Sequence, residues 1–144
     1  TRGTGVINRL FNSYATYKGE ISGRRNGVLI SNDTGQAVAY ALFNLQDRGD
    51  MFVSHQTPVY QGMIVGEHNR SNDLEVNVLR GKKLTNVRAS GTDDAVSLSP
   101  PRNLTLEDMM AYLNQDELLE VTPITLRLRK QFLLSHERKK AARN

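Results

Sequence analysis

The spacing of apolar residues is mostly strand-like beyond the first 20 positions, and turn residues interrupt it at short intervals. Residues 28–30 are apolar, residues 31–35 carry Asp and Gly turn chemistry, and residues 36–45 are again largely apolar. This arrangement predicts a β-hairpin whose second strand covers residues 36–45. One face of that strand would hold Val38, Tyr40 and Leu42.

Short strands are also expected later in the chain, at residues 51–53, 59–60, 63–65 and 74–78. The last of these alternates apolar and polar side chains, as a half-buried strand does. A further alternation covers residues 124–129, where the core-facing set would be Ile124, Leu126 and Leu128.

One helix has clear start signals after the Pro100-Pro101 pair. Thr105 can cap it, because Asp108 follows three residues later and completes a capping-box-like pair. The apolar residues at helical spacing, which predict a face packed on the sheet, are Leu106, Met109, Met110 and Leu113. A second helix is expected to begin at Ser135 and to fray toward its end.

Length, composition and charge narrow the class of protein. The 144 residues, 38% of them apolar, suffice for one domain or one domain plus a remnant. The formal net charge of +4 favours an anionic partner. Cysteine is absent, and no apolar run approaches the ~18 residues of a membrane-spanning helix. We therefore expect a cytoplasmic protein without membrane association.

Residues 81–94 combine clustered positive charge with small polar side chains and almost no core-forming residue. Four cations occur there or just before, with no carboxylate among them: Arg80, Lys82, Lys83 and Arg88. Neutral hydrogen-bonding groups come from Thr85, Asn86 and Ser90. This mixture suits phosphates and sugars, so the segment is a candidate RNA-binding loop. The alternative is a solvated, mobile loop without a partner.

A second candidate contact is Arg127 and Arg129, which would share the face of their strand opposite the core, with Lys130 directly after them. Arginine offers a rigid fork that matches phosphate. The alternative is an internal ion-pair network with the acidic residues that gather just before, together with a solvated basic tail. Arg24 and Arg25 are weaker candidates, for which a charge pair in a linker is the favoured explanation.

Catalytic and metal-binding patterns are missing from the sequence. His55, His68 and His136 lack the spacing of a metal site, and no cysteine could complete one. The Asp93-Asp94 pair is more simply a turn or helix cap than a general acid and base. The Gly-Lys-Lys run at position 81 is not a phosphate-binding loop, which requires Gly-x-x-x-x-Gly-Lys and then Ser or Thr. We expect neither catalysis nor a cofactor in this chain.

The run from residue 66 to 78, GEHNRSNDLEVNV, leads into the candidate loop, and the two together closely resemble the C-terminal domain of the BipA (TypA) family of ribosome-binding translational GTPases. Further similar segments lie at residues 25–31, 45–49, 116–123 and 126–130. The beginning of the chain, with a strand-like segment at residues 6–14, resembles the last strand of an α/β domain shared with elongation factor G. We therefore expect residues 1–20 to be the tail of that domain and residues 21–144 to form the family's C-terminal domain.

The expected fold is α+β, mainly antiparallel and barrel-like, with one or two packed helices. The resemblance implies binding to the 70S ribosome and its large subunit, with residues 81–95 near ribosomal RNA and the acceptor end of A-site tRNA. It also implies a link to large-subunit assembly and to adaptation to cold or stress. GTP and magnesium would belong to a GTP-hydrolysing region outside this chain.

The predicted RNA-binding residues are Arg80, Lys82, Lys83, Thr85, Asn86, Arg88, Ser90, Arg127, Arg129 and Lys130. A monomer is favoured. The alternative function is a protein-protein interaction or self-association module in which RNA has a minor role. Aromatic residues are absent from the loop, so recognition would rely on the RNA backbone and its shape.

Overall fold

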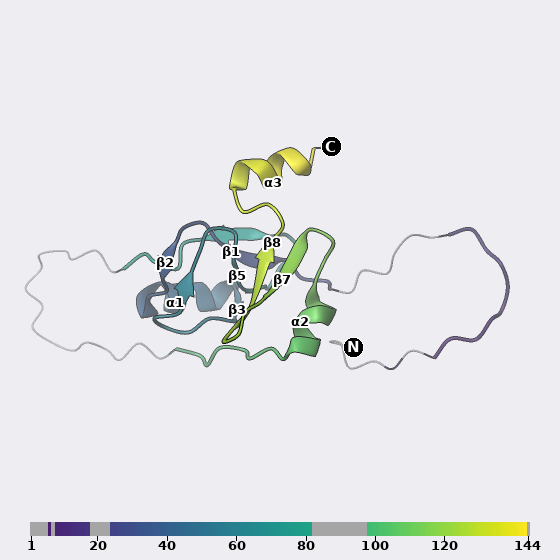
Figure 1. The fold of residues 1–144 in the computed structure, drawn as a ribbon, viewed down its shortest axis with the longest axis horizontal. Coiled ribbons are helices and arrows are strands. Elements are labelled where there is room, and N and C mark those ends of the chain that lie inside the picture. Colours follow the sequence, from purple (N-terminus) through teal and green to yellow (C-terminus); the bar gives the residue numbers. More distant parts are fainter. Residues whose placement is uncertain (1–5, 7, 18–23, 82–97, 144) are drawn as a thin grey trace, which may run out of the picture.

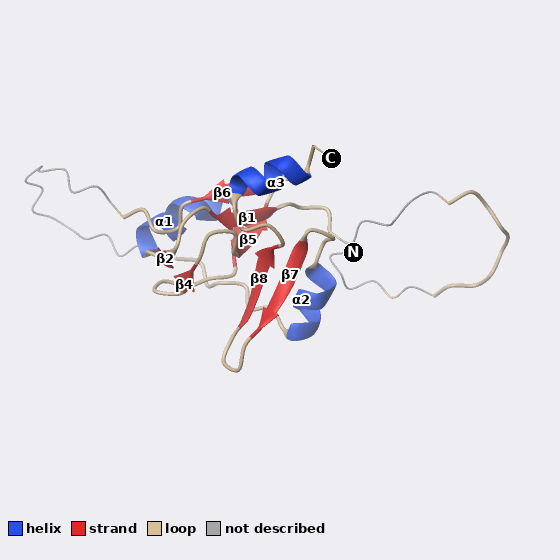
Figure 2. Cartoon of the chain, turned by 45° about the horizontal axis from the view of Figure 1, so that its top comes forward, coloured by secondary structure: helices blue, strands red, loops and turns tan. Residues whose placement is uncertain are grey.

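A computed structural model of the chain describes residues 6, 8–17, 24–81 and 98–143, and all structural statements below concern these residues. The central element is a four-stranded sheet in the order β3-β5-β1-β6. Figure 1 labels β3, β5 and β1, and Figure 2 labels β6. Its strands are β1 (Val28–Ser31), β3 (Gly49–Met51), β5 (Ile64–His68) and β6 (Leu74–Val76). The pairs β1–β5 and β3–β5 are antiparallel, whereas β1 and β6 are parallel.

Two small antiparallel sheets accompany the central one. The first pairs β2 (Gly35–Gln36) with β4 (Pro58–Val59), and the second is the hairpin of β7 (Glu117–Val121) and β8 (Leu126–Lys130). A bridge between Met63 and Arg129 connects β8 to the residues before β5. The mixed α+β class and the mainly antiparallel pairing are confirmed. The barrel is not found, because no sheet closes on itself within the described ranges.

The predicted strand at residues 36–45 is wrong, since most of it forms helix α1 (Ala39–Leu45), followed by a 3₁₀ turn, η1 (Gln46–Arg48). The predicted hairpin is therefore wrong as well, and β1 pairs with β5 and β6 instead. The apolar residues here fit the period of a strand and also that of a helix. Val38, Ala41, Leu42 and Leu45 are spaced i, i+3, i+4 and i+7, as on one face of a helix. Alanine-rich sequence favours the helix, which buries Ala41 and Leu42.

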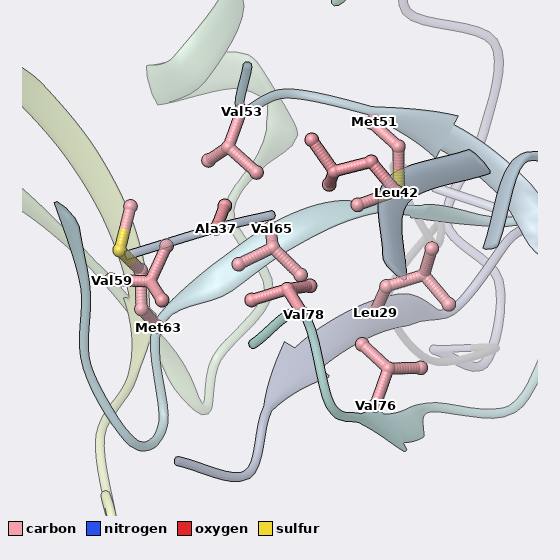
Figure 3. Close-up of a cluster of buried hydrophobic side chains, with 10 residues drawn as sticks. All are labelled: Leu29, Ala37, Leu42, Met51, Val53, Val59, Met63, Val65, Val76 and Val78. Atoms are coloured by element: carbon pink, nitrogen blue, oxygen red, sulfur yellow. The ribbon is translucent and has the colours of Figure 1, made fainter. Parts of the chain in front are cut away.

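Two hydrophobic clusters form the core. The larger one lies between the central sheet, α1 and β4, and Figure 3 shows its ten buried residues: Leu29, Ala37, Leu42, Met51, Val53, Val59, Met63, Val65, Val76 and Val78. The smaller one consists of Val28, Ile30, Ile64, Tyr112 and Leu128, which brings the β7–β8 hairpin and helix α2 (Leu106–Tyr112) onto the sheet. Alternate residues of β1 thus pack into different clusters, with Leu29 in the larger one and Val28 and Ile30 in the smaller one.

Helix α2 has the predicted capping box: the Thr105 hydroxyl accepts from the backbone N–H of Asp108, whose carboxylate accepts from that of Thr105. Its predicted apolar face is only partly right. Met109 packs on the smaller cluster, but Met110 is 62% exposed, and Tyr112 is the buried residue of the helix. The expected C-terminal helix is confirmed as α3 (Ser135–Ala141).

The beginning of the chain differs from expectation. Val6 and residues 8–17 form neither strand nor helix and are exposed. The strand expected at residues 6–14 is therefore absent from the described part of that segment, and the domain boundary near residue 20 remains a prediction.

Candidate nucleic-acid interface

Residues 82–97 lie outside the described residues, and they include all of the predicted loop after Gly81, with Lys82, Lys83, Thr85, Asn86, Arg88 and Ser90. The residues on either side of it are described. Leu79 and Leu98 both pack against the larger core cluster. The backbone N–H of Ser99 donates to the Gln46 side chain, and that of Arg102 donates to the Met51 carbonyl. The segment therefore leaves and re-enters the same folded body.

Arg80 stands at the point where the described chain leaves this body, and it is exposed. The residue two positions earlier, Val78, is fully buried, and its carbonyl accepts from the N–H of Val38. Arg80 thus follows a fixed stretch of backbone and is available to an anionic partner.

Arg127 and Arg129 lie on one face of β8, as predicted, and both are half-buried. Cross-strand pairing sets Arg127 opposite Glu120 and Arg129 opposite Leu118. The Glu120 carboxylate is already a hydrogen-bond acceptor, since the Tyr60 hydroxyl donates to it at 2.8 Å. Among the described residues, neither guanidinium forms an ion pair with a carboxylate. The internal-network alternative therefore does not describe these two arginines.

The surroundings of Tyr60 show how close the two arginines are to this hydrogen bond. Burial, the hydrogen bond to Glu120 and its negative charge together raise the pKa of Tyr60 to about 12, while Arg129 and Arg127 oppose that rise. Arg129 also lines an open hollow of about 510 Å³, together with Tyr60, Gln131, Leu133 and Glu137. The hollow gives an anionic group access to the Arg129 side of β8.

Lys130 differs from the prediction, because its side chain is buried and already paired. Its ammonium nitrogen lies 2.6 Å from Asp73, 2.7 Å from Asp116 and 3.0 Å from Glu117. Burial alone would lower the pKa of Lys130, but the hydrogen bonds to Asp116 and Asp73 and the charge of Glu117 raise it above its ordinary value. With three carboxylates around it, Lys130 is unavailable to an RNA phosphate in this structure.

Strand alternation could have revealed this placement. Lys130 is two residues from Leu128 and four from Leu126, so it shares their inward face, while Arg127 and Arg129 share the other. The three cations therefore do not form one stripe.

Arg24 is a second residue whose place the sequence interpretation missed. Its guanidinium forms a two-pronged ion pair with Glu117, at 2.9 and 2.7 Å, and lies 4.3 Å from the centre of the Tyr112 ring. Burial opposes the charge of Arg24, but Glu117 raises its pKa. Burial likewise opposes the charge of Glu117, yet Arg24 and Lys130 lower the pKa of its carboxyl. The ionised pair is thus the stable form.

We refer to these five residues as the Glu117 cluster: Arg24, Asp73, Asp116, Glu117 and Lys130. The cluster joins the segment before β1, the residue before β6 and both strands of the β7–β8 hairpin. Its role is to fix the hairpin, and with it the outward face that carries Arg127 and Arg129.

No metal-binding group of three or more His, Cys, Asp or Glu side chains occurs among the described residues. His68 is buried, and its Nδ1 lies 2.6 Å from the carbonyl oxygen of Asn72, while His55 and His136 are exposed. None of the helices in the described ranges has the length and apolarity to span a bilayer.

Comparison with known proteins identifies the family. The model of the TypA/BipA C-terminal domain matches residues 26–135, which is most of the chain. The chain belongs to the TypA/BipA C-terminal domain family. The match includes the central sheet, the β7–β8 hairpin and Arg80, Arg127 and Arg129, whereas Arg24 and nearly all of α3 lie outside it.

Similar full-length proteins carry the name large ribosomal subunit assembly factor BipA. The one from Buchnera aphidicola subsp. Schizaphis graminum is 57% identical over 145 residues, which is 100% of this chain and 24% of that protein. The proteins from Escherichia coli strain K12 and Salmonella typhimurium strain LT2 are each 54% identical, over 99% of this chain and 24% of their own length. The BipA-family chain thus spans about a quarter of the curated relatives it matches.

Proposed function

We propose that this chain is a ribosome-binding module that acts in assembly of the large ribosomal subunit. The names of its relatives support the role in assembly. The observation that carries direct RNA contact is the pair Arg127 and Arg129: both occupy one face of β8, and within the described ranges no carboxylate pairs with either. Arginine guanidinium groups in this state suit phosphate oxygens.

In this proposal, residues 81–95 make the principal contact with ribosomal RNA and the acceptor end of A-site tRNA, and Arg80, Arg127 and Arg129 add phosphate contacts. Fixed attachment on both sides of the loop supports this role, because a loop held at both ends by one core can present its cations in a restricted region. The longer protein would act in the cytoplasm as a translational GTPase on the 70S ribosome, as a monomer, and would contribute to adaptation to cold or stress.

The test is the salt dependence of binding to purified large ribosomal subunits. If roughly five phosphates are engaged, a fourfold rise in salt should weaken binding by about 10²-fold or more. Replacing Lys82, Lys83 and Arg88 together by Gln should flatten this dependence and leave the melting temperature nearly unchanged. Arg127→Gln with Arg129→Gln should produce a smaller change in the same direction.

The matched control removes the same charge elsewhere. Arg9, Arg48 and Arg70 are exposed and are not among the candidate RNA contacts, so replacing all three by Gln also lowers the net charge by three. If the loop variant bound like this control, with the same salt slope, specific loop contact would be wrong.

A protein-binding function is the second candidate, and one observation favours it. Val121 ends β7 and Ile124 lies in the turn before β8, and they are 66% and 89% exposed although both are apolar. The prediction that Ile124 faces the core is therefore wrong. Loss of subunit binding in Val121→Ser with Ile124→Ser, with the loop variant binding normally, would favour a ribosomal protein as the main contact.

A further inference from the structure

Helix α3 is fixed to the sheet by one of its own cations. The Arg138 guanidinium donates to the carbonyl oxygens of Phe132, at 2.9 Å, and Leu133, and forms an ion pair with Glu75 of β6 at 2.8 Å. The pKa of the Glu75 carboxyl is lowered, first by a hydrogen bond with Ser135 and then by the interaction with Arg138. Burial acts in the opposite direction but is outweighed. The anchoring carboxylate is therefore ionised at neutral pH.

Three further cations follow Arg138, and the charge of the nearest one, Lys139, also lowers the pKa of Glu75. Lys139, Lys140 and Arg143 are exposed, and within the described part of the chain none of them forms an ion pair with a carboxylate. Figure 2 shows α3 beside β6, on the outside of the folded body. Glu137, the acidic residue of the helix, lines the hollow that also contains Arg129. Helix α3 and the turn that follows it thus present three exposed cations on a fixed support.

We infer that α3 is a separate contact for the phosphate backbone of structured RNA, positioned by the ion pair between Arg138 and Glu75. This inference rests on the proposed function, but it uses residues of the chain different from those of the loop and of β8. Lys139, Lys140 and Arg143 would contact phosphates, while Arg138 and Glu75 are positioning residues that hold the helix in place.

The chemistry of the helix favours RNA phosphate over a lipid surface. A helix that lies in a membrane interface needs large apolar residues opposite its cations. Helix α3 itself contains no large apolar residue. The partly exposed Phe132 and Leu134 precede the helix and are not interleaved with its cations. Three cations with no Phe, Tyr or Trp among them suit a backbone contact that is independent of base sequence.

Substitutions of Glu75 distinguish positioning of α3 from a purely electrostatic effect of the charge on RNA binding. Glu75→Gln removes a negative charge next to a cationic helix, so attraction alone would make RNA binding tighter. If the ion pair positions α3, the same change releases the helix, and binding becomes weaker. Glu75→Asp keeps the charge and should retain most of the binding. The two explanations therefore predict opposite signs for one substitution.

The experiment measures binding of the 144-residue chain to a 20-base-pair RNA duplex by fluorescence anisotropy at several salt concentrations. Replacing Lys139, Lys140 and Arg143 together by Gln should weaken binding by about tenfold or more at moderate salt, and the salt slope should fall by up to about one unit for each phosphate that is no longer bound. The Arg9, Arg48 and Arg70 triple variant is the equal-charge control. Glu75→Gln should weaken binding, with an unchanged melting profile of the core.

Different failures have different meanings. If the α3 triple variant matched the control, or if Glu75→Gln bound the duplex more tightly, the inference would be overturned while loop-based binding could stand. If the unaltered chain bound neither the duplex nor large subunits, the proposed function and this inference would both be wrong. Binding to vesicles rich in anionic lipid, but not to the duplex, would assign α3 to a membrane surface instead.

Discussion

Arg24 and Glu117 are 93 positions apart in the chain, yet a guanidinium nitrogen of the first lies 2.7 Å from a carboxylate oxygen of the second. Their side chains are 6% and 0% exposed. The Glu117 side chain also accepts from Lys130, so one buried carboxylate pairs with two cations. This arrangement connects the segment before β1 to the hairpin that displays Arg127 and Arg129.

Breaking the Glu117 cluster should destabilise the fold strongly. Glu117→Gln leaves Arg24 and Lys130 with one carboxylate fewer, and Lys130→Met leaves Glu117 with Arg24 alone. Removal of one partner from a buried ion pair typically costs about 3–5 kcal/mol, so each change should lower the free energy of unfolding in urea by roughly that amount. The control is Arg102→Gln, which breaks a largely exposed pair with Glu67 and should cost about 0–1 kcal/mol. Equal costs for the buried and exposed pairs would contradict this role of the cluster.

The pH dependence of stability follows from the same cluster. Arg24 and Lys130 lower the pKa of Glu117 below its ordinary value of 4.5, so its contribution is complete above that pH and is lost as the pH falls through the lowered pKa. The pKa of Lys130 is raised above its ordinary 10.5, so its contribution is complete below that pH and is lost as the pH rises through the raised pKa. Melting temperatures measured from pH 2 to 7 should fall on the acid side, and Glu117→Gln should flatten part of that fall. Parallel curves for the two proteins would contradict the assignment.

Tyr112 has a buried hydroxyl without a hydrogen-bond partner among the described residues, and burial is the main cause that raises its pKa. Tyr112→Phe removes this group and keeps the ring that contacts Phe52 edge-on, with centroids 5.5 Å apart. The free energy of unfolding should stay constant or rise by about 1 kcal/mol. Tyr60→Phe is the control, because it loses a hydrogen bond to Glu120 and should lower stability by about 1 kcal/mol. A clear loss of stability in Tyr112→Phe would mean that its hydroxyl has a stabilising partner.

Gly62 occupies a backbone conformation, φ +87°, that other residues rarely adopt. A Cβ atom there would lie 2.7 Å from the Cα of Leu133 and 2.9 Å from its carbonyl oxygen. Gly62→Ala should therefore destabilise the chain by more than about 1 kcal/mol, through backbone strain and through displacement of the segment before α3. Gly81→Ala meets no atom within 4 Å and should be nearly neutral, so equal melting temperatures would contradict the close approach at Gly62.

The chain should neither bind GTP tightly nor hydrolyse it, because its sequence contains no phosphate-binding Gly-x-x-x-x-Gly-Lys-Ser/Thr motif. Calorimetric titration with GTP and magnesium should give no measurable heat of binding. A dissociation constant in the micromolar range would place a nucleotide site in this chain and would contradict the expectation.

Local signals in the sequence were sufficient for several elements. The Thr105–Asp108 capping box, the alternating strand at β6 and helix α3 are all where the sequence placed them, because short-range hydrogen bonds and side-chain period decide them. Residues 36–45 were predicted wrongly, since their apolar positions satisfy the strand period and the helix period together. Packing against the larger core cluster selects the helix.

By itself, the sequence determined the family resemblance, the α+β class and the position of most elements. Only the tertiary structure decided which cations are free for a partner. Arg127 and Arg129 remain without a carboxylate in the described ranges, but Lys130 turns inward to Asp73, Asp116 and Glu117, and Arg24 joins the same group. The physical reason is that a charge takes its state from neighbours brought together by folding, and these neighbours lie up to 93 positions away along the chain.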